Sequence, residues 1–129
     1  MINITESELE EVIDKFKRLV ISDKYNISSG ENREKNDKFI SENFITRNRI
    51  KKMLLELTTK DCISVEKHNK DRDKVVYIFV KEYNISTRYN KENVKVYIKF
   101  TLCLVRCQDY AVVISFHEQE GREKEYLFR

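Results

Sequence analysis

The spacing of apolar residues changes once along this chain, near residue 74, and that change restricts the fold more than any other feature. Before it, apolar residues recur every three or four positions, as on one face of an α-helix. After it, they alternate with polar residues, as in a β-strand with one covered face. The sequence therefore predicts a single α+β domain over residues 1–129, with a helical half at about 1–62 and a sheet half at about 74–118.

The helical half contains recognisable helix starts. Thr5-Glu6-Ser7-Glu8 has the capping-box pattern, in which a Thr hydroxyl and a Glu carboxylate satisfy free amides, and it predicts a helix over residues 6–20. A short helix is expected over residues 37–44. Thr46 can cap a third helix, whose apolar stripe is Ile50, Met53, Leu54 and Leu57. The polar stretch 21–36 between them is expected to be a loop with a short strand at residues 25–27.

The sheet half contains three β-rich runs, at residues 75–83, 94–106 and 110–117. We expect them to form an antiparallel meander of about three to four strands, packed on one face by two to three helices. The first connection, residues 84–93, is long and polar, whereas the second, around residues 106–109, is short.

Alternation along each strand divides its side chains between two faces of the sheet. One set is apolar and is expected to face the helices: Val76, Ile78, Val80, Val96, Ile98, Phe100, Leu102, Val112, Ile114 and Phe116. The other set mixes cations, hydroxyls, an imidazole and aromatic rings, and is expected to face solvent: Tyr77, Phe79, Lys81, Tyr97, Lys99, Thr101, Ser115 and His117.

The polar set suits RNA cleavage without a metal, in which a base takes the ribose 2′-OH proton and a cation stabilises the crowded phosphorus. His117 is the natural proton carrier, since an imidazole titrates near neutral pH. Lys99 and Lys81 are expected to bind phosphate, and Tyr97 to orient the scissile group. The alternative is an ordinary wet sheet face, on which amphipathic Tyr and Lys are common.

A further set of residues is expected to bind the RNA strand itself. Tyr77 and Phe79 can stack on unpaired bases, Arg88 can contact phosphate, and Ser115 lies on the same predicted face. Residues 66–110 hold ten Lys and Arg against six Asp and Glu, which favours a basic surface, although a solvated face explains the same charges. His68 lies in a polar run that is more typical of a solvated loop.

Several protein classes are not supported by the sequence. It contains no Gly-rich phosphate loop, no HExxH motif and no carboxylates at metal-binding spacing, so we expect no cofactor and no metal. No run of about 18 apolar residues is present and the N-terminus is acidic, so a cytoplasmic protein without membrane contact is expected. Cys62, Cys103 and Cys107 are expected to be reduced, and the last two to be small buried residues rather than metal ligands.

The second half resembles toxins of the MqsR (motility quorum-sensing regulator) family. Residues 50–118 carry the resemblance, in blocks that follow the family's order. These blocks are Leu55-Glu56-Leu57-Thr58 with Asp61, then residues 76–82 (VYIFVKE), residues 96–100 (VYIKF) and residues 114–118 (ISFHE).

The resemblance implies a RelE-like sheet packed by helices and the activity of a bacterial or phage toxin from a toxin–antitoxin system. Such a toxin is an mRNA interferase, a hydrolase that cleaves single-stranded mRNA sequence-selectively and independently of the ribosome, and a cognate antitoxin protein neutralises it. The resemblance also assigns a family tyrosine to Tyr97 and a basic residue to His117, and it places lysines at Lys99 and Lys81.

A second hypothesis remains open at this stage. The same scaffold can serve as a non-enzymatic inhibitor from a phage or mobile element, which grips a protein or RNA with the basic face. An adjacent small antitoxin gene would favour the toxin, whereas a position among phage genes would favour the inhibitor.

Overall fold

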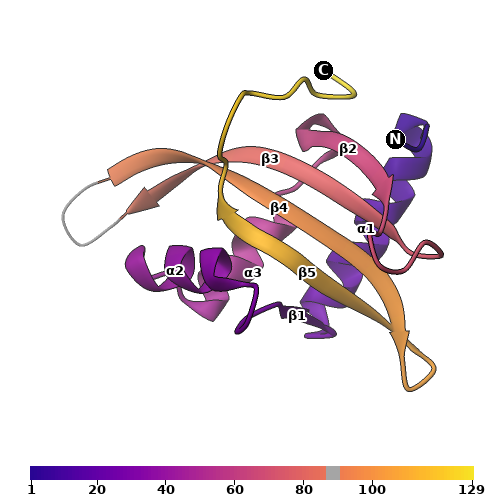
Figure 1. Cartoon of the computed structure of the whole chain (residues 1–129), viewed down its shortest axis with the longest axis horizontal. Coiled ribbons are helices and arrows are strands. Elements are labelled where there is room, and N and C mark those ends of the chain that lie inside the picture. The colour runs from indigo at the N-terminus through magenta and orange to yellow at the C-terminus, as the bar shows by residue number, and fades with distance from the viewer. Residues whose placement is uncertain (87–90) are drawn as a thin grey trace.

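Three strands from the predicted sheet half and two short strands from earlier in the chain form one five-stranded mixed sheet, against which the helices pack. The computed structural model describes residues 1–86 and 91–129. Within these residues lie three α-helices, one 3₁₀ turn and five strands (Figure 1). In chain order they are α1 (Glu6–Ile21), β1 (Tyr25–Ile27), α2 (Glu34–Glu42), α3 (Arg47–Leu55), η1 (Thr59–Asp61), β2 (Cys62–Lys67), β3 (Val75–Ser86), β4 (Lys91–Val105) and β5 (Gln108–Glu118).

The strand order is β1-β5-β4-β3-β2. Neighbouring strands from β2 to β5 are antiparallel, whereas the short β1 runs parallel to β5, with Tyr25 opposite Ala111. The predicted α+β class is confirmed, but the sheet is mixed and larger than the antiparallel meander of three to four strands that the sequence predicted. Parallel pairing joins strands far apart in the chain, so local patterns do not reveal it.

The predicted helix starts at Thr5 and Thr46 are confirmed. Thr5 and Glu8 form a reciprocal capping box, with bonds of 3.1 Å and 3.0 Å between each side chain and the other's backbone amide. The Thr46 hydroxyl accepts a bond from the Arg49 amide at 3.1 Å. The helix that was expected over residues 37–44 begins earlier, at Glu34.

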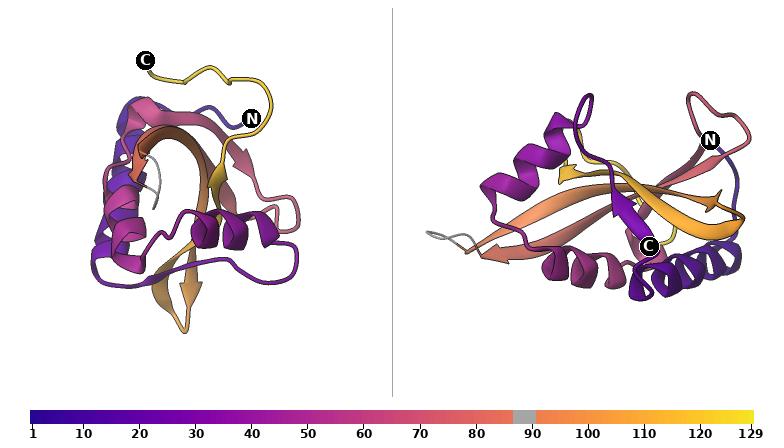
Figure 2. Two further views of the ribbon diagram at one scale, coloured as in Figure 1. Left: turned by 90° about the vertical axis from the view of Figure 1, so that its left-hand side faces the viewer. Right: turned by 90° about the horizontal axis from the view of Figure 1, so that it is seen from below.

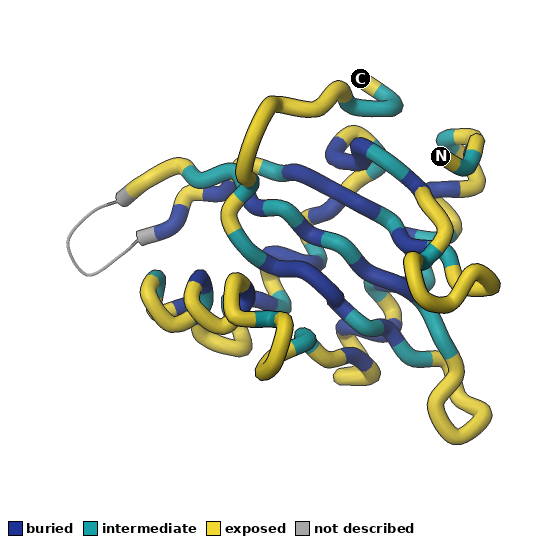
Figure 3. Tube along the Cα trace, in the orientation of Figure 1, coloured by how far each residue is buried: buried dark blue, intermediate teal, exposed yellow. Residues whose placement is uncertain are grey.

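α1 and α3 lie along one face of the sheet, whereas α2 stands beside the outer edge of β5 (Figure 2, right). Phe39 of α2 joins the same core as α1 and α3, with its ring centroid 5.9 Å from that of Phe116. The core lies between the sheet and α1 and α3. At its centre the Phe100 ring stacks on Phe16, with ring centroids 3.9 Å apart, and on Phe79 at 5.4 Å. All three rings are fully buried, and in the middle of β4 buried positions alternate with half-buried ones (Figure 3). A Phe100→Ala change would remove this contact and cost about 3–5 kcal/mol.

The predicted division of β3 between the two faces is wrong. Phe79 is buried in the core beside Ile98, its partner on β4, whereas Ile78 and Val80 lie on the opposite face in a separate small cluster. Both sets of alternate residues in β3 are apolar, so alternation alone could not decide which set faces the helices. On β4 the prediction holds: Ile98 and Phe100 face the core.

A β-bulge changes the face prediction in β5 as well. Lys99 pairs with Ser115 but the next residue, Phe100, pairs with Val113, so Ile114 is the extra residue. As a result Val113 and Phe116 both join the core with the helices, whereas Ile114 does not. Asn36 of α2 holds the bulge in place: its amide group donates to the Ile114 carbonyl and accepts from the Phe116 amide, both at 2.9 Å.

Both long hairpins extend beyond the predicted strands. β3 continues to Ser86 and β4 begins at Lys91, so much of the stretch expected as a polar connection is strand. Arg106 and Cys107 form the tight turn between β4 and β5, with φ of 51° and 64°. Cys107 is exposed and Cys103 half-buried, so the expectation that both are buried is wrong. No helix within the described residues has the length and apolar character needed to cross a membrane.

Candidate functional site

A groove of about 390 Å³ crosses the sheet face that points away from α1 and α3, here called the open face. Its floor includes Ile78 of β3, Tyr97 and Lys99 of β4, and Ile114 of β5. One wall is the segment that leads into α2, with Arg33, and the other is the loop between β2 and β3. In Figure 2 (right), the start of α2 and this loop both rise on the side of the sheet opposite α1 and α3. The sheet forms the floor of the groove, and two segments that are far apart in the sequence form its walls.

The groove carries an excess of positive charge. Arg33, Lys67, Lys70 and Lys99 line it against one acid, Glu66, and we refer to it as the cationic groove. A concave, partly enclosed surface with cations of this kind concentrates anions, because field lines are focused between low-dielectric walls. This lining suits a chain of phosphates.

Lys99 is more buried than Lys67 and Lys70, which are exposed. It is half-buried, and within residues 1–86 and 91–129 no carboxylate lies at ion-pair distance from its ammonium. Burial lowers the pKa of Lys99, the Arg33 guanidinium lowers it further, and Glu66 partly opposes them. An unpaired cation with a lowered pKa can both attract phosphate and release a proton more readily than an ordinary lysine.

Tyr97 and His117 form a stacked pair beside Lys99. They face each other across β4 and β5, with ring centroids 5.3 Å apart and planes 18° from parallel. Burial, and then the Glu66 carboxylate, raise the pKa of Tyr97, so its hydroxyl stays protonated and available as a donor. His117 Nδ1 lies 2.9 Å from the Glu118 carbonyl oxygen. Because a carbonyl only accepts, Nδ1 carries the proton, and Nε2 of the neutral ring is left as an acceptor.

Of the predicted site residues, the structure brings four to the open face. Tyr97 and Lys99 line the cationic groove, and Ser115 is buried opposite Lys99. His117 lies beside Tyr97 but lines a neighbouring hollow with Lys35 and Glu120. Their grouping follows from the register between β4 and β5. That register depends on the bulge at Ile114, because without the extra residue Ser115 and His117 would point to the core.

Three other predicted site residues lie on the helix side of the sheet, so their expected placement is wrong. Lys81 pairs with the buried Asp61 at 3.1 Å, while Phe79 is fully buried and Tyr77 packs half-buried on Phe100. All three errors have the same cause, because these residues lie on β3, whose two faces were predicted the wrong way round. Arg88 lies outside the described residues.

Sequence reasoning missed Arg33 and most of the loop that forms the second wall. Arg33 lies in a polar stretch with no local signal, and only the packing of α2 against β5 brings it to the groove. Residues 66–70, which are the end of β2 and the start of the loop after it, were interpreted as part of a solvated loop, yet they line the groove and include His68. His68 Nδ1 accepts bonds from the amides of Lys70 and Asp71 at 3.1 Å and 3.2 Å, which fixes the loop.

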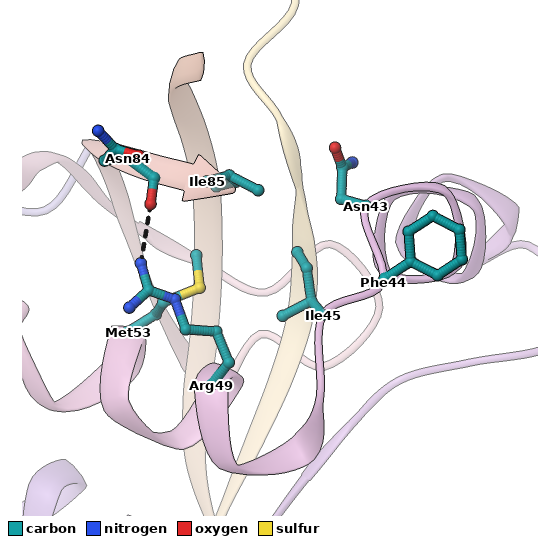
Figure 4. A pocket seen from close by; sticks show the side chains of 7 residues that line it. All are labelled: Asn43, Phe44, Ile45, Arg49, Met53, Asn84 and Ile85. Atoms are coloured by element: carbon teal, nitrogen blue, oxygen red, sulfur yellow. Dashed lines mark hydrogen bonds between the residues drawn. The ribbon is translucent and has the colours of Figure 1, made fainter. Parts of the chain in front are cut away.

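A second hollow, of about 280 Å³, lies between the α2–α3 connection and β3 (Figure 4). Arg49, its one charged residue, donates to the Asn84 carbonyl at 3.0 Å, and Phe44 stands exposed at its rim. That guanidinium is already bonded, and no acid, imidazole or thiol accompanies it among the described residues that line the hollow, so the cationic groove is the better candidate site. Within residues 1–86 and 91–129 no cluster of three or more His, Cys, Asp or Glu is placed to hold a metal ion.

Comparisons with protein families, with curated proteins and with solved structures find no match to this chain. The fold and groove therefore define it only as an α+β protein with a cationic groove across the open face of a mixed sheet.

Proposed function

We propose that this protein is a metal-independent endoribonuclease that cleaves single-stranded RNA in the cationic groove. The observation that carries the proposal is a phenol and a half-buried ammonium, those of Tyr97 and Lys99, in a groove lined by further cations, with the His117 imidazole stacked on Tyr97 just outside that lining. Phosphate binding, proton transfer and charge stabilisation are the three functions that RNA cleavage requires.

In the proposed reaction, His117 Nε2 accepts the proton of a ribose 2′-OH as O2′ attacks the adjacent phosphorus. The bond from phosphorus to the 5′-oxygen breaks, and that oxygen takes a proton from the Lys99 ammonium, whose lowered pKa favours the transfer. The Tyr97 hydroxyl donates to a non-bridging phosphate oxygen and orients it. The products are a 2′,3′-cyclic phosphate and a 5′-hydroxyl, and the two protein groups then exchange protons with water.

Lys81, Tyr77 and Phe79 have no role in this scheme, because they face the helices. Arg33 takes over as the second phosphate-binding cation. Together with the resemblance to MqsR toxins, the site supports a more specific proposal: an mRNA interferase with a RelE-like sheet, neutralised by a cognate antitoxin. The resemblance covers the two strands that carry Tyr97, Lys99 and His117.

The test is cleavage of single-stranded RNA by purified protein in the presence of a metal chelator, with mapping of the product ends. We expect cyclic phosphate ends, and no cleavage when the 2′-hydroxyls are methylated. His117→Ala should slow cleavage by about 10²–10⁴-fold while binding changes far less. Tyr97→Phe, which keeps the ring, should also slow it.

A matched pair of lysine variants separates the groove from charge in general. Lys99→Gln should weaken RNA binding and flatten its salt dependence by about one unit of slope. Lys52→Gln removes the same charge from an exposed position on α3, on the far side of the sheet, and should leave both unchanged. Salt-dependent binding without any cleavage would instead support the non-enzymatic inhibitor.

A further inference from the structure

The segment that follows β5 crosses the open face, and hydrogen bonds hold its end to η1 and to the start of β2. It runs from the end of β5 toward the start of β2 (Figure 1). There the Leu127 amide donates to the Cys62 carbonyl at 3.0 Å, and Arg129 Nε donates to the Lys60 carbonyl at 2.9 Å. Arg129 also lies 3.6 Å from the buried Asp61 carboxylate. These bonds hold residues 119–129, here called the tail, in a defined position over the sheet.

The tail also encloses a separate hollow on the open face, next to the cationic groove. Tyr126 packs against the apolar cluster of Ile63, Ile78 and Val80. Beside it lies a space of about 360 Å³, here called the tail hollow, whose lining is Ile63, Ser64, Glu66, Ile78, Tyr97, Lys124 and Glu125. Its base is apolar and its rim polar, which is the usual construction of a small-molecule site.

The tail hollow adjoins the cationic groove. Glu66, Ile78 and Tyr97 line both, so the Tyr97 ring forms part of each. The two spaces differ in charge. The cationic groove has four cations and one acid, whereas the tail hollow has Glu66 and Glu125 against Lys124 alone.

We propose that the tail hollow binds one base of the RNA strand whose phosphates lie in the cationic groove, an inference that rests on the proposed function. The two carboxylates disfavour a phosphate there but accept hydrogen bonds from the ring N–H and amino groups of a base. The apolar base of the hollow and the edge of Tyr97 suit a flat, unstacked ring. The RNA phosphates thus bind in the cationic groove, and one base of the same strand binds in the adjoining tail hollow.

The proposal is tested by binding of single-stranded oligonucleotides about ten nucleotides long, fully 2′-O-methylated so that they are not cleaved, in which each position in turn is made abasic. In the wild type, removing the base that occupies the tail hollow should weaken binding by about five-fold or more. Ser64→Phe would fill the hollow, because Ser64 pairs with Ile78 on the same face. In that variant the abasic penalty at the same position should disappear.

Asn93→Phe is the matched control, since Asn93 is exposed on β4 and lines neither space. It should keep the wild-type abasic profile. An unchanged profile in a folded Ser64→Phe protein, or a wild-type profile that is equal at all positions, would overturn the subsite while leaving salt-dependent RNA binding intact. Absence of that salt-dependent binding would instead reject the proposed function itself.

Tyr126→Ala provides an independent arm that does not rely on filling the hollow. If the tail is a wall of the subsite, loosening it should weaken binding of the intact oligonucleotide and reduce the abasic penalty at the same position. Stronger binding by Tyr126→Ala would mean that the tail obstructs the RNA, and would overturn the proposal.

Discussion

Asn36 offers a sharp test of how the site is held, because one buried side chain fixes the β5 bulge. Its amide group makes three hydrogen bonds of 2.9 Å: it donates to the carbonyls of Ile114 and Ser28 and accepts from the Phe116 amide. The side chain is only 2% exposed, so water cannot replace these bonds without opening the contact between α2 and β5. Asn36→Ala leaves three backbone groups without their partner.

The magnitude follows from the number of bonds lost. Each net hydrogen bond contributes about 1 kcal/mol, and a buried group left unsatisfied costs somewhat more, so Asn36→Ala should lower the free energy of unfolding by about 3 kcal/mol. For a chain of this size that corresponds to a fall in Tm of roughly 10 °C. Asn43→Ala is the control: Asn43 also belongs to the end of α2 but makes one part-buried bond, to the Phe39 carbonyl, and should cost about 1 kcal/mol or less.

Urea and thermal unfolding followed by circular dichroism measure the difference directly. Asn36→Asp adds a second test. The aspartate keeps an acceptor for the Phe116 amide, but at neutral pH its carboxylate cannot donate to the carbonyls of Ser28 and Ile114 and is repelled by them. It should be at least as unstable as Asn36→Ala at neutral pH and recover partly in acid, where a protonated Asp can donate again. If Asn36→Ala costs no more than Asn43→Ala, the bulge does not depend on this side chain and the reasoning fails.

Three further predictions concern other parts of the molecule. A bond from Lys60, and then one from Thr59, lower the pKa of Glu6, so its stabilising contribution is present above the ordinary value of 4.5 and lost as the pH falls through the lowered value. Glu6→Gln should therefore be less stable than wild type at pH 7 and equal to it near pH 2, as measured by Tm. Burial raises the pKa of the Cys62 thiol to about 11, whereas Cys107 is exposed. An alkylating reagent at pH 8 should label Cys107 rapidly and Cys62 only in urea; rapid labelling of both in the native state would contradict the fold there. Phe44, which follows α2, has a φ of 52° and is 69% exposed. Because glycine adopts a positive φ without strain, Phe44→Gly should raise the free energy of unfolding by about 0.5 kcal/mol. A lower unfolding midpoint would show that the ring stabilises the fold.

The elements with local signals were predictable from the sequence. Thr5 and Thr46 cap helices because their hydroxyls satisfy amides a few residues away, which is a short-range interaction. The two faces of β4 were assigned correctly because its inward residues are apolar and Tyr97 and Lys99 alternate with them. In β3 the same reasoning failed, since Tyr77 and Phe79 are as apolar as their neighbours and only the pairing with β4 decides their direction.

Site residues, too, could be predicted only where the residues that position them are close in the sequence. Tyr97 and Lys99 could be grouped because they alternate on one strand. His117 reaches the same face only through the bulge, which Asn36 stabilises from a helix far away in the sequence. Arg33 and the segment of residues 66–70 were missed because their place in the groove is set by tertiary packing. Lys81 was misplaced because its partner, Asp61, belongs to a different element.

The parallel pairing of β1 with β5 has a consequence for how the chain assembles during synthesis. β1 and Asn36 leave the ribosome well before residues 111–116, with which they pair, so neither has its partner until β5 has emerged. The cationic groove needs the same late strand, because β5 carries Ile114 of its floor and α2 brings Arg33 to the groove by packing on β5. A nascent chain that still lacks β5 therefore has no complete cationic groove, so any binding in that groove has to wait until β5 has been synthesised.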